Sequence, residues 1–283
     1  MTAVFRFLSR WPLAPLHALG AVLGWLGWLL SPPSRRRFAE LSRQAGYAFA
    51  EVRAGVAEAG RLIAELPRLW LGDPVPVRWE RPELLEAAFA RGRGVLFLTP
   101  HLGCFEVTPQ ALARDHGARL GPITVLYRPA RQPWLAELER RARERPHLST
   151  APTSLAGVRQ MLRALKRGEA VGLLPDQVPP HGQGVWAPFF GRPAYTMTLA
   201  ARLARQSGAA VVLAWGERLP GGSGYCVHLR ELSAPLPENA ERAATQINAE
   251  MERLIRECPT QYLWGYGRYK GPRGDAATEE AIP

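Results

Sequence analysis

The chain has 283 residues, of which 47% are hydrophobic and 22% are charged, and its formal net charge is +11. This composition allows a buried core, which excludes a disordered chain, a collagen-like fibre and a small disulfide-stapled scaffold. A single long apolar stretch, near the start, excludes a polytopic membrane protein. Cys104, Cys226 and Cys258 are far apart and odd in number. They predict no disulfide framework and favour a reducing compartment.

All of the 36 basic residues except Lys166 and Lys270 are arginine. An arginine-rich genome would produce this bias without any functional meaning. A functional origin requires an acidic partner, which is a phosphate-bearing lipid, an anionic membrane surface, an acidic protein or a nucleic acid. A nucleic-acid-binding protein would cluster its cations with aromatic residues on one face. The arginines here are spread along predicted helices and mixed with Glu, which predicts no nucleic-acid partner.

The first predicted element is a membrane anchor within residues 1–33. Leu13 to Leu30 reads LAPLHALGAVLGWLGWLL and carries no formal charge, and a spanning helix needs roughly 17–25 such residues. The apolar region is longer than a signal-peptide core, and no small-residue cleavage site follows it, so we expect the segment to be retained. The alternative is a buried helix packed on the domain. The arginines at 35–37 favour a cytoplasmic C-terminal domain.

Residues 34–72 form the second predicted unit, an amphipathic helical segment. From Phe38 to Leu66, apolar residues recur mostly at three- and four-residue steps, while Arg and Glu fill the opposite face. This pattern predicts a long helix with one apolar side. The helix either faces the core of the protein or lies on the membrane beside the anchor.

Residues 73–271 alternate strands with helices, which predicts an α/β sheet with helices on its faces. Strands are expected at 75–79, 95–99, 123–127, 170–174, 210–215 and 225–230, the last one pairing back after a Pro-Gly-rich turn. Helices are expected at 82–91, 133–144, 154–167, 196–206 and 239–257. The polar residues 272–283 are expected to form a flexible tail.

The most informative segment is VLFLTPHLGCFE at residues 95–106. A buried strand ends at Pro100, which places His101 at the carboxyl end of a strand, where ligands bind in α/β sheets. Gly103 permits a turn that would bring Glu106 back toward His101. A carboxylate bonded to one imidazole nitrogen raises the basicity of the other, which can then remove a proton from a hydroxyl. The alternative is a purely structural His–Glu pair.

This His-x4-Glu block resembles that of the membrane glycerolipid acyltransferase superfamily. From the anchor to about Lys270, the chain resembles one branch closely, the late acyltransferases of lipid A biosynthesis. The resemblance is carried by HLGCFE (101–106), LYRPARQPWL (126–135), LLPDQVPPHGQGVWAPFFGRPAYT (173–196) and QYLWGYGRYK (261–270). It implies a central mixed β-sheet flanked by helices. The chain departs from the family at Cys104, where Asn is frequent, at Tyr266, where His is frequent, and at Leu41-Ser42, where Asn-Leu is frequent.

The resemblance also implies an activity. The donor would be a C12–C14 acyl chain on acyl carrier protein, with no other cofactor, and the acceptor would be a hydroxyl of a phosphorylated, Kdo-bearing lipid A precursor. The enzyme would work at the bacterial inner membrane with its catalytic domain on the cytoplasmic face. Within it, His101 would be the general base, Glu106 would orient His101 and stabilise its cation, and Arg128 would steady the oxyanion or a phosphate.

Further candidates for substrate binding come from the later blocks. Asp176 follows the strand at 170–174 and would hold Arg128 or line the acceptor site, unless it is only a cap. Gln177 follows it in the Asp-Gln stretch of the family. The candidates for lipid phosphates are Arg192, Arg268 and Lys270, with solvated surface charge as the alternative.

Several alternatives remain open from sequence. Trp186, Phe189 and Phe190 would form a wall of the acyl pocket or pack in the core. Cys104, close to His101, is a candidate nucleophile for a covalent acyltransferase or thioesterase. A second possibility for the acceptor, in place of a lipid A precursor, is another glycolipid or a lysophospholipid. No metal site is predicted, because His116, His147, His181 and His228 lack ligand spacing with one another and with cysteine.

Overall fold

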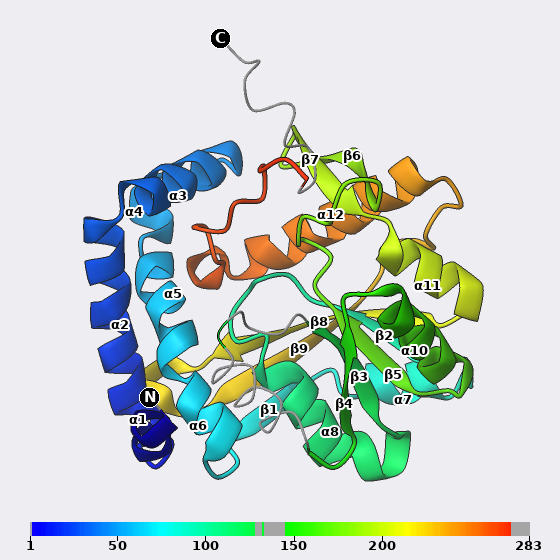
Figure 1. Ribbon diagram of the computed structural model, residues 1–283, viewed down its shortest axis with the longest axis horizontal. Coiled ribbons are helices and arrows are strands. Elements are labelled where there is room, and N and C mark those ends of the chain that lie inside the picture. Colours follow the sequence, from blue (N-terminus) through cyan, green and yellow to red (C-terminus); the bar gives the residue numbers. More distant parts are fainter. Residues whose placement is uncertain (1, 128–131, 133–144, 273–283) are drawn as a thin grey trace.

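A computed structural model of the chain describes residues 2–127, 132 and 145–272. Within these residues, seven strands form a central sheet in the order β1-β9-β8-β2-β5-β3-β4 (Figure 1). The strands are β1 (Val77–Glu80), β2 (Val95–Leu98), β3 (Ile123–Tyr127), β4 (Leu148–Pro152), β5 (Ala170–Leu173), β8 (Ala210–Arg218) and β9 (Tyr225–Glu231). Neighbours are parallel except β8 and β9, which are antiparallel. The predicted mixed α/β sheet is confirmed.

Helices cover both faces of the sheet because its central strands are apolar on both sides. In β2, Leu96 and Leu98 join one buried cluster, and Val95 and Phe97 join another. The first cluster is covered by α10 (Leu155–Lys166), α11 (Leu199–Ser207) and α12 (Ala240–Glu257). The second is covered by α7 (Glu83–Phe89) and α8 (Val107–Leu120). A separate hairpin of β6 (Gly184–Phe189) and β7 (Arg192–Met197) packs on α12.

The N-terminal region forms six helices in the described chain. They are α1 (Thr2–Leu8), α2 (Leu13–Leu30), α3 (Pro32–Gln44), α4 (Phe49–Val52), α5 (Ala54–Ala64) and α6 (Leu66–Leu71). The continuous helix expected between 34 and 72 is therefore wrong, since that stretch forms α3 to α6. A turn at Gly46, with a φ of 89°, separates α3 from α4. The short 3₁₀ turns η1 (Pro220–Gly222) and η2 (Pro259–Gln261) complete the fold.

Helix α2 is the one helix in the described residues that is long and apolar enough to cross a bilayer. It lies against α5 with backbones in contact, because glycines meet at the crossing. A Cβ on Gly60 would overlap the carbonyl oxygen of Gly20, and it would lie 2.7 Å from the Cα of Gly24. Small residues allow helices to approach this closely. The opposite side of α2 exposes leucine and valine side chains.

Both ends of α2 are held by the body of the protein. At its start, Gly222 of η1 packs on the backbone of Ala14. Near its end, the Trp28 ring stacks on Phe49 of α4, with centroids 5.3 Å apart. Helix α2 therefore runs along the side of the domain instead of projecting from it (Figure 1).

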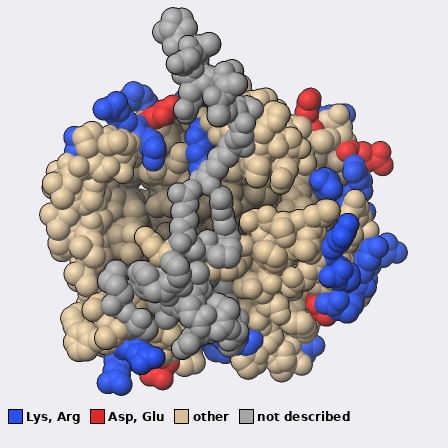
Figure 2. Space-filling model, in the orientation of Figure 1, with Lys and Arg blue, Asp and Glu red and all other residues tan. Residues whose placement is uncertain are grey.

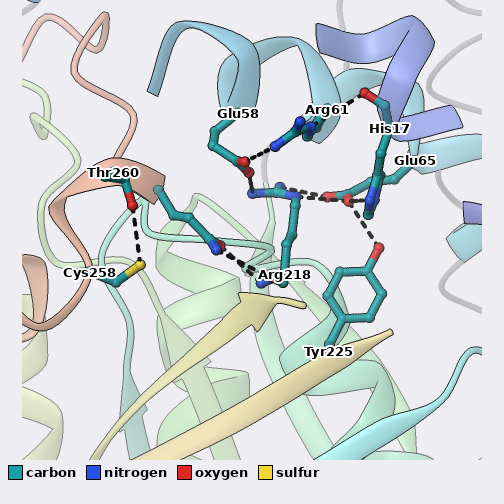
Figure 3. Close-up of polar contacts among 9 residues, drawn as sticks. His17, Glu58, Arg61, Glu65, Arg218, Tyr225, Cys258 and Thr260 are labelled. Carbon is teal, nitrogen blue, oxygen red and sulfur yellow. Dashed lines mark hydrogen bonds and ion pairs between the residues drawn. The ribbon is translucent and has the colours of Figure 1, made fainter. Parts of the chain in front are cut away.

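A buried ionic network joins α2 and α5 to the end of the sheet (Figure 3). Arg218 of β8 donates to Glu65 from Nε at 2.9 Å and from Nη2 at 2.6 Å, and from Nη1 to Glu58 at 3.1 Å. Glu65 also lies 3.0 Å from His17 Nε2 of α2 and accepts from the Tyr225 hydroxyl at 2.9 Å. Burial opposes ionisation of Glu65, but Arg218 and His17 outweigh it and lower its pKa to about 2.

Candidate active site

His101 lies at the carboxyl end of β2, as predicted, in a turn that is pinned to the neighbouring strand. Gly103 has a φ of 57°, in the left-handed region that favours glycine. The turn packs on β8, where the Cys104 amide donates to the Gly216 carbonyl at 2.7 Å. A Cβ on Gly103 would overlap that same carbonyl. The histidine is thus held on a rigid turn at the edge of the sheet.

Asp176, at the carboxyl end of β5, contacts His101 through both carboxylate oxygens. Its Oδ1 lies 2.8 Å from Nδ1 of the ring, and its Oδ2 accepts from the His101 backbone amide at 2.9 Å. Burial favours the neutral acid, but the charge of His101 and its hydrogen bonds outweigh burial and lower the pKa of Asp176. An ionised carboxylate only accepts hydrogen bonds. Nδ1 therefore carries a proton, and in the neutral imidazole Nε2 presents a lone pair.

The hydrogen bond expected between Glu106 and His101 does not form, and Asp176 is the carboxylate that contacts Nδ1 of the ring. Glu106 holds the N-cap position of α8 and accepts from Trp70 Nε1 of α6 at 3.3 Å. The turn at Gly103 exists, but it directs this carboxylate toward α6. Asp176 was expected to hold Arg128 or to line the acceptor site. Arg128 lies outside the described residues, as does the helix expected at 133–144.

The C-terminal aromatic segment closes one side of the site. The ring of Tyr266 stacks on His101 with centroids 4.5 Å apart and planes within 17°. The Leu263 amide donates to the His101 carbonyl at 2.9 Å. The Tyr262 hydroxyl lies 3.5 Å from Asp176 Oδ2. From this segment the sequence analysis assigns only Arg268 and Lys270 to the site, and none of these three residues.

Arg268 is not available to a lipid phosphate, which corrects its predicted role. Its side chain is 1% exposed and holds the β6–β7 hairpin to α12. It donates to the Tyr195 carbonyl at 2.8 Å, to Thr196 Oγ1 at 2.7 Å and to Asn248 Oδ1 at 3.1 Å. Nη1 and Nη2 thus donate to acceptors inside the protein, while the buried Nε has no partner among the described residues.

The other predicted substrate-binding residues lie at the surface. Arg192 pairs with Glu40 of α3, and its guanidinium lies 4.5 Å from the centroid of the Tyr269 ring. Gln177 is exposed. Lys270 is exposed, with Nζ 4.9 Å from the centroid of the Tyr266 ring.

An apolar cavity of about 270 Å³ lies beside the site, on the face of the sheet covered by α8. Phe105, whose ring centroid is 5.3 Å from that of His101, lines it together with Glu106 and Gln177. The deeper lining is apolar and includes Phe97, Leu112, Val125, Leu126, Leu173 and Leu229. The aromatic run expected to line such a pocket lies elsewhere, since Phe189 and Phe190 are buried in the other core cluster and Trp186 is exposed.

Cys104 is not suited to nucleophilic catalysis. Its side chain is completely buried against Glu65. Burial raises the pKa of the thiol well above its ordinary value, and the negative charge of Glu65 raises it further. A thiol reacts as its thiolate, so this residue is inert at neutral pH. Sequence reasoning had left Cys104 open as a nucleophile beside His101, and this environment argues against it.

Glu80, Cys226 and His228 lie close enough to share a metal ion. Both ring nitrogens of His228 are already hydrogen-bonded to carboxylates, Nδ1 to Glu80 and Nε2 to Glu217 at 2.8 Å. A metal ion would have to displace one of these carboxylates from the ring. This cluster is therefore described best as a set of ion pairs.

A histidine–carboxylate pair therefore lies at the carboxyl edge of an α/β sheet, beside an apolar cavity. The family model of bacterial lipid A biosynthesis acyltransferases matches residues 42–271. The protein belongs to this family.

Three relatives place the chain within the family. It is 34% identical over 184 residues to the lipid A biosynthesis lauroyltransferase of Escherichia coli K12, covering 64% of this chain and 58% of that protein. It is 28% identical over 216 residues to the palmitoleoyltransferase of the same strain, covering 75% and 68%. A Haemophilus influenzae lipid A biosynthesis acyltransferase is 25% identical over 285 residues, covering 95% and 88%. The match thus spans less than two thirds of the lauroyltransferase.

Proposed function

We propose that the protein transfers a fatty acyl chain of 12 to 14 carbons from acyl carrier protein to a hydroxyl of a Kdo-bearing lipid A precursor. The observation that carries this proposal is the His101–Asp176 pair, which presents a free imidazole nitrogen at the edge of the sheet. Membership of the family supports the reaction class. Relatives named as lauroyl- and palmitoleoyltransferases support an acyl donor of medium to long chain.

In the proposed reaction, His101 Nε2 takes the proton of the acceptor hydroxyl. The oxygen then attacks the thioester carbonyl, so a C–O bond forms and the carbonyl becomes an oxyanion. When the oxyanion collapses, the C–S bond breaks, and the carrier thiolate takes the proton back from His101. Asp176 stabilises the imidazolium between these steps. Such a general base contributes roughly 10²- to 10⁴-fold to the rate. Arg128 remains our candidate for stabilising the oxyanion.

The apolar cavity beside Phe105 is the proposed site for the acyl chain of the donor. Its lining is mostly aliphatic and aromatic, and it begins within van der Waals reach of the His101 environment. Glu106 and Gln177 provide polar groups on its wall, where the thioester end of the chain would lie. This arrangement gives Glu106 a role at the donor instead of at the imidazole.

The proposed location is the cytoplasmic face of the bacterial inner membrane. Helix α2 has an uncharged outer surface, seen as the tan left edge in Figure 2, and the basic residues of α3 lie at its end. Because the body holds both ends of α2, we propose that the helix lies in the membrane surface instead of spanning the bilayer. The net charge of +11 suits an anionic leaflet and an acidic carrier protein.

The test is a transfer assay on membranes that contain the protein. The donors are acyl carrier proteins loaded with chains of different length, the acceptor is a Kdo-bearing tetra-acylated lipid A precursor, and the product is read by mass spectrometry. We expect the acceptor to gain one acyl group, and we expect His101→Ala to lose this activity. His147→Asn, at an exposed histidine outside the site, is the matched control. Transfer only to lysophospholipids or other glycolipids would replace the proposed acceptor, and substantial turnover by His101→Ala would refute the proposed base.

A further inference from the structure

A second hollow, of about 880 Å³, lies between the N-terminal helices and the C-terminal segment. Its walls are α2, the start of α3, α5 and residues 263–270. Figure 2 shows the surface hollowed between the N-terminal helices, on the left, and the body of the protein. Its size falls within the roughly 300–1,000 Å³ of typical ligand pockets. In the described part of the chain, no residue lines both this groove and the cavity proposed for the donor.

The groove has an apolar end and a cationic end. Leu23 of α2 and Ile63 of α5 line the apolar end, and Ile63 is 65% exposed. At the other end, Arg37 and Lys270 converge on Gly267, where a Cβ would lie 4.0 Å from Arg37 Nε and 3.6 Å from Lys270 Cδ. Among the residues that the structure describes, the lining contains no Asp or Glu. Within the described residues, Arg37 forms no ion pair. This polarity matches an amphiphile with an apolar chain and an anionic head group.

The groove leads from the apolar surface of α2 to Tyr266 and Leu263, which contact His101. Leu23 is part of both the exposed face of α2 and the wall of the groove. At the inner end, Tyr266 lines the groove and stacks on the His101 ring, and Leu263 lines it and donates to the His101 carbonyl. Phe105, which lines the donor cavity, packs on the same ring. His101 therefore lies between two separate spaces, as a transfer between two bulky substrates requires.

We propose that this groove binds the acyl acceptor, a phosphorylated glycolipid that enters sideways from the membrane. An acyl chain of the acceptor lies along Leu23 and Ile63, and a phosphate binds between Arg37 and Lys270. This inference rests on the proposed function, because it assigns the groove to the acceptor of that same reaction. A phospholipid, which shares the phosphate and the chains, is the competing occupant that the experiment must exclude.

The first measurement is the KM of each substrate in charge variants. Arg37→Ala and Lys270→Ala should each raise the KM for the phosphorylated acceptor about tenfold, because each removes a charge-assisted contact. The KM for the acyl carrier protein should stay unchanged. Arg36→Ala removes the neighbouring exposed charge of α3, which does not line the groove, and should leave both values unchanged. An unchanged acceptor KM in both groove variants, or an equal rise in Arg36→Ala, would overturn the proposal.

The second measurement reads binding without turnover. Ile63→Cys, combined with His101→Ala, is labelled with a maleimide in detergent, and the modified peptide is quantified by mass spectrometry. The lipid A precursor should slow labelling at least tenfold, whereas phosphatidylglycerol at the same mole fraction should have little effect. Leu155→Cys, a comparably exposed position on α10, is the control and should be insensitive to both lipids.

The two measurements separate failure of the groove from failure of the proposed function. If the wild type transfers acyl chains to the precursor but the precursor does not protect position 63, the groove assignment is wrong and the reaction stands. If the precursor protects position 63 but the wild type does not acylate it, the groove stands and the reaction is wrong. Equal protection by phosphatidylglycerol would show a general membrane contact and would overturn the acceptor assignment.

Discussion

Changing Asp176 to Asn tests the histidine–carboxylate pair with almost no change of shape. In the native site, Oδ2 accepts from the His101 backbone amide at 2.9 Å, and Oδ1 faces Nδ1 at 2.8 Å. The backbone amide still needs an acceptor in the variant, so the amide oxygen of Asn must occupy the Oδ2 position. Facing the NH₂ group toward that amide would cost roughly 1–3 kcal/mol. The NH₂ group is thereby directed at Nδ1 of the ring.

The expected consequence is a loss of the base. An NH₂ group facing Nδ1 makes that nitrogen an acceptor, so the ring proton moves to Nε2, where the acceptor hydroxyl must deliver its own. The charge that stabilises the imidazolium is also removed. We expect kcat to fall roughly 10²- to 10⁴-fold, the range that a general base contributes. The corresponding change in the triad of a serine protease costs about 10⁴-fold. The KM values should change little, because Asp176 faces the histidine.

The assay is steady-state acyl transfer with purified protein in detergent, with thermal unfolding as a check on folding. Asp73→Asn, at a highly exposed aspartate, is the matched control and should behave as wild type. Tyr262→Phe tests the weak 3.5 Å contact to Oδ2 and should lower kcat only a few-fold. If Asp176→Asn keeps more than a tenth of the wild-type kcat while folded, or loses activity only through KM, the assigned role of Asp176 is wrong.

The remaining predictions concern the buried network and the donor cavity. Glu65→Gln should destabilise the fold by about 3–5 kcal/mol, because it removes the carboxylate charge that accepts two hydrogen bonds from the buried Arg218 and leaves only Glu58 to pair with it. Equal unfolding free energies in urea would contradict this. Folding lowers the pKa of Glu65 from 4.5 to about 2. Its contribution of about 3 kcal/mol to the free energy of unfolding is therefore present above pH 4.5 and is lost as the pH falls toward 2. The exposed control Glu83→Gln should show this loss of stability in acid, and Glu65→Gln should not. Gly172→Leu should fill the cavity, because a Cβ there points at Val125 from 3.4 Å. If the leucine excludes two methylenes of the acyl chain from the cavity, at about 0.8 kcal/mol each, kcat/KM for a C14 donor should fall roughly tenfold relative to a C10 donor. An unchanged preference for chain length, read by mass spectrometry of the products, would place the acyl chain elsewhere.

Much of the local structure follows from sequence patterns. The strand at 123–127 was predicted with its observed bounds, and Ser154 caps α10 by accepting from the Gly157 amide, as expected. His101 was expected at the end of a buried strand, which is where it lies. These features depend on residues that are close in the chain: an apolar run of strand length, a hydroxyl before a helix, and a proline and a glycine that bound a turn.

Other features were misjudged because local patterns do not contain them. Residues 34–72 were expected to continue as one helix, but they form four, and Arg268 was expected at the surface, but it is buried. From sequence alone, a basic residue is assigned to the surface, because the acceptors that would bury it are distant in the chain. The acceptors of Arg268 lie in the β6–β7 hairpin and on α12. Of the tail expected at 272–283, only residue 272 is among the described residues.

The sequence by itself indicated most strands and helices of the α/β body, although not β4, β6 or β7, and it indicated that His101 and Asp176 each follow a strand. Only the tertiary structure decided that these strands are neighbours, with Leu98 of β2 opposite Leu173 of β5. That adjacency makes Asp176, instead of Glu106, the partner of His101. The tertiary structure also places α2 along α5 and forms the groove that ends at Tyr266. The physical reason is that helices and turns depend on interactions within a few residues, whereas strand order depends on how all the apolar faces bury one another.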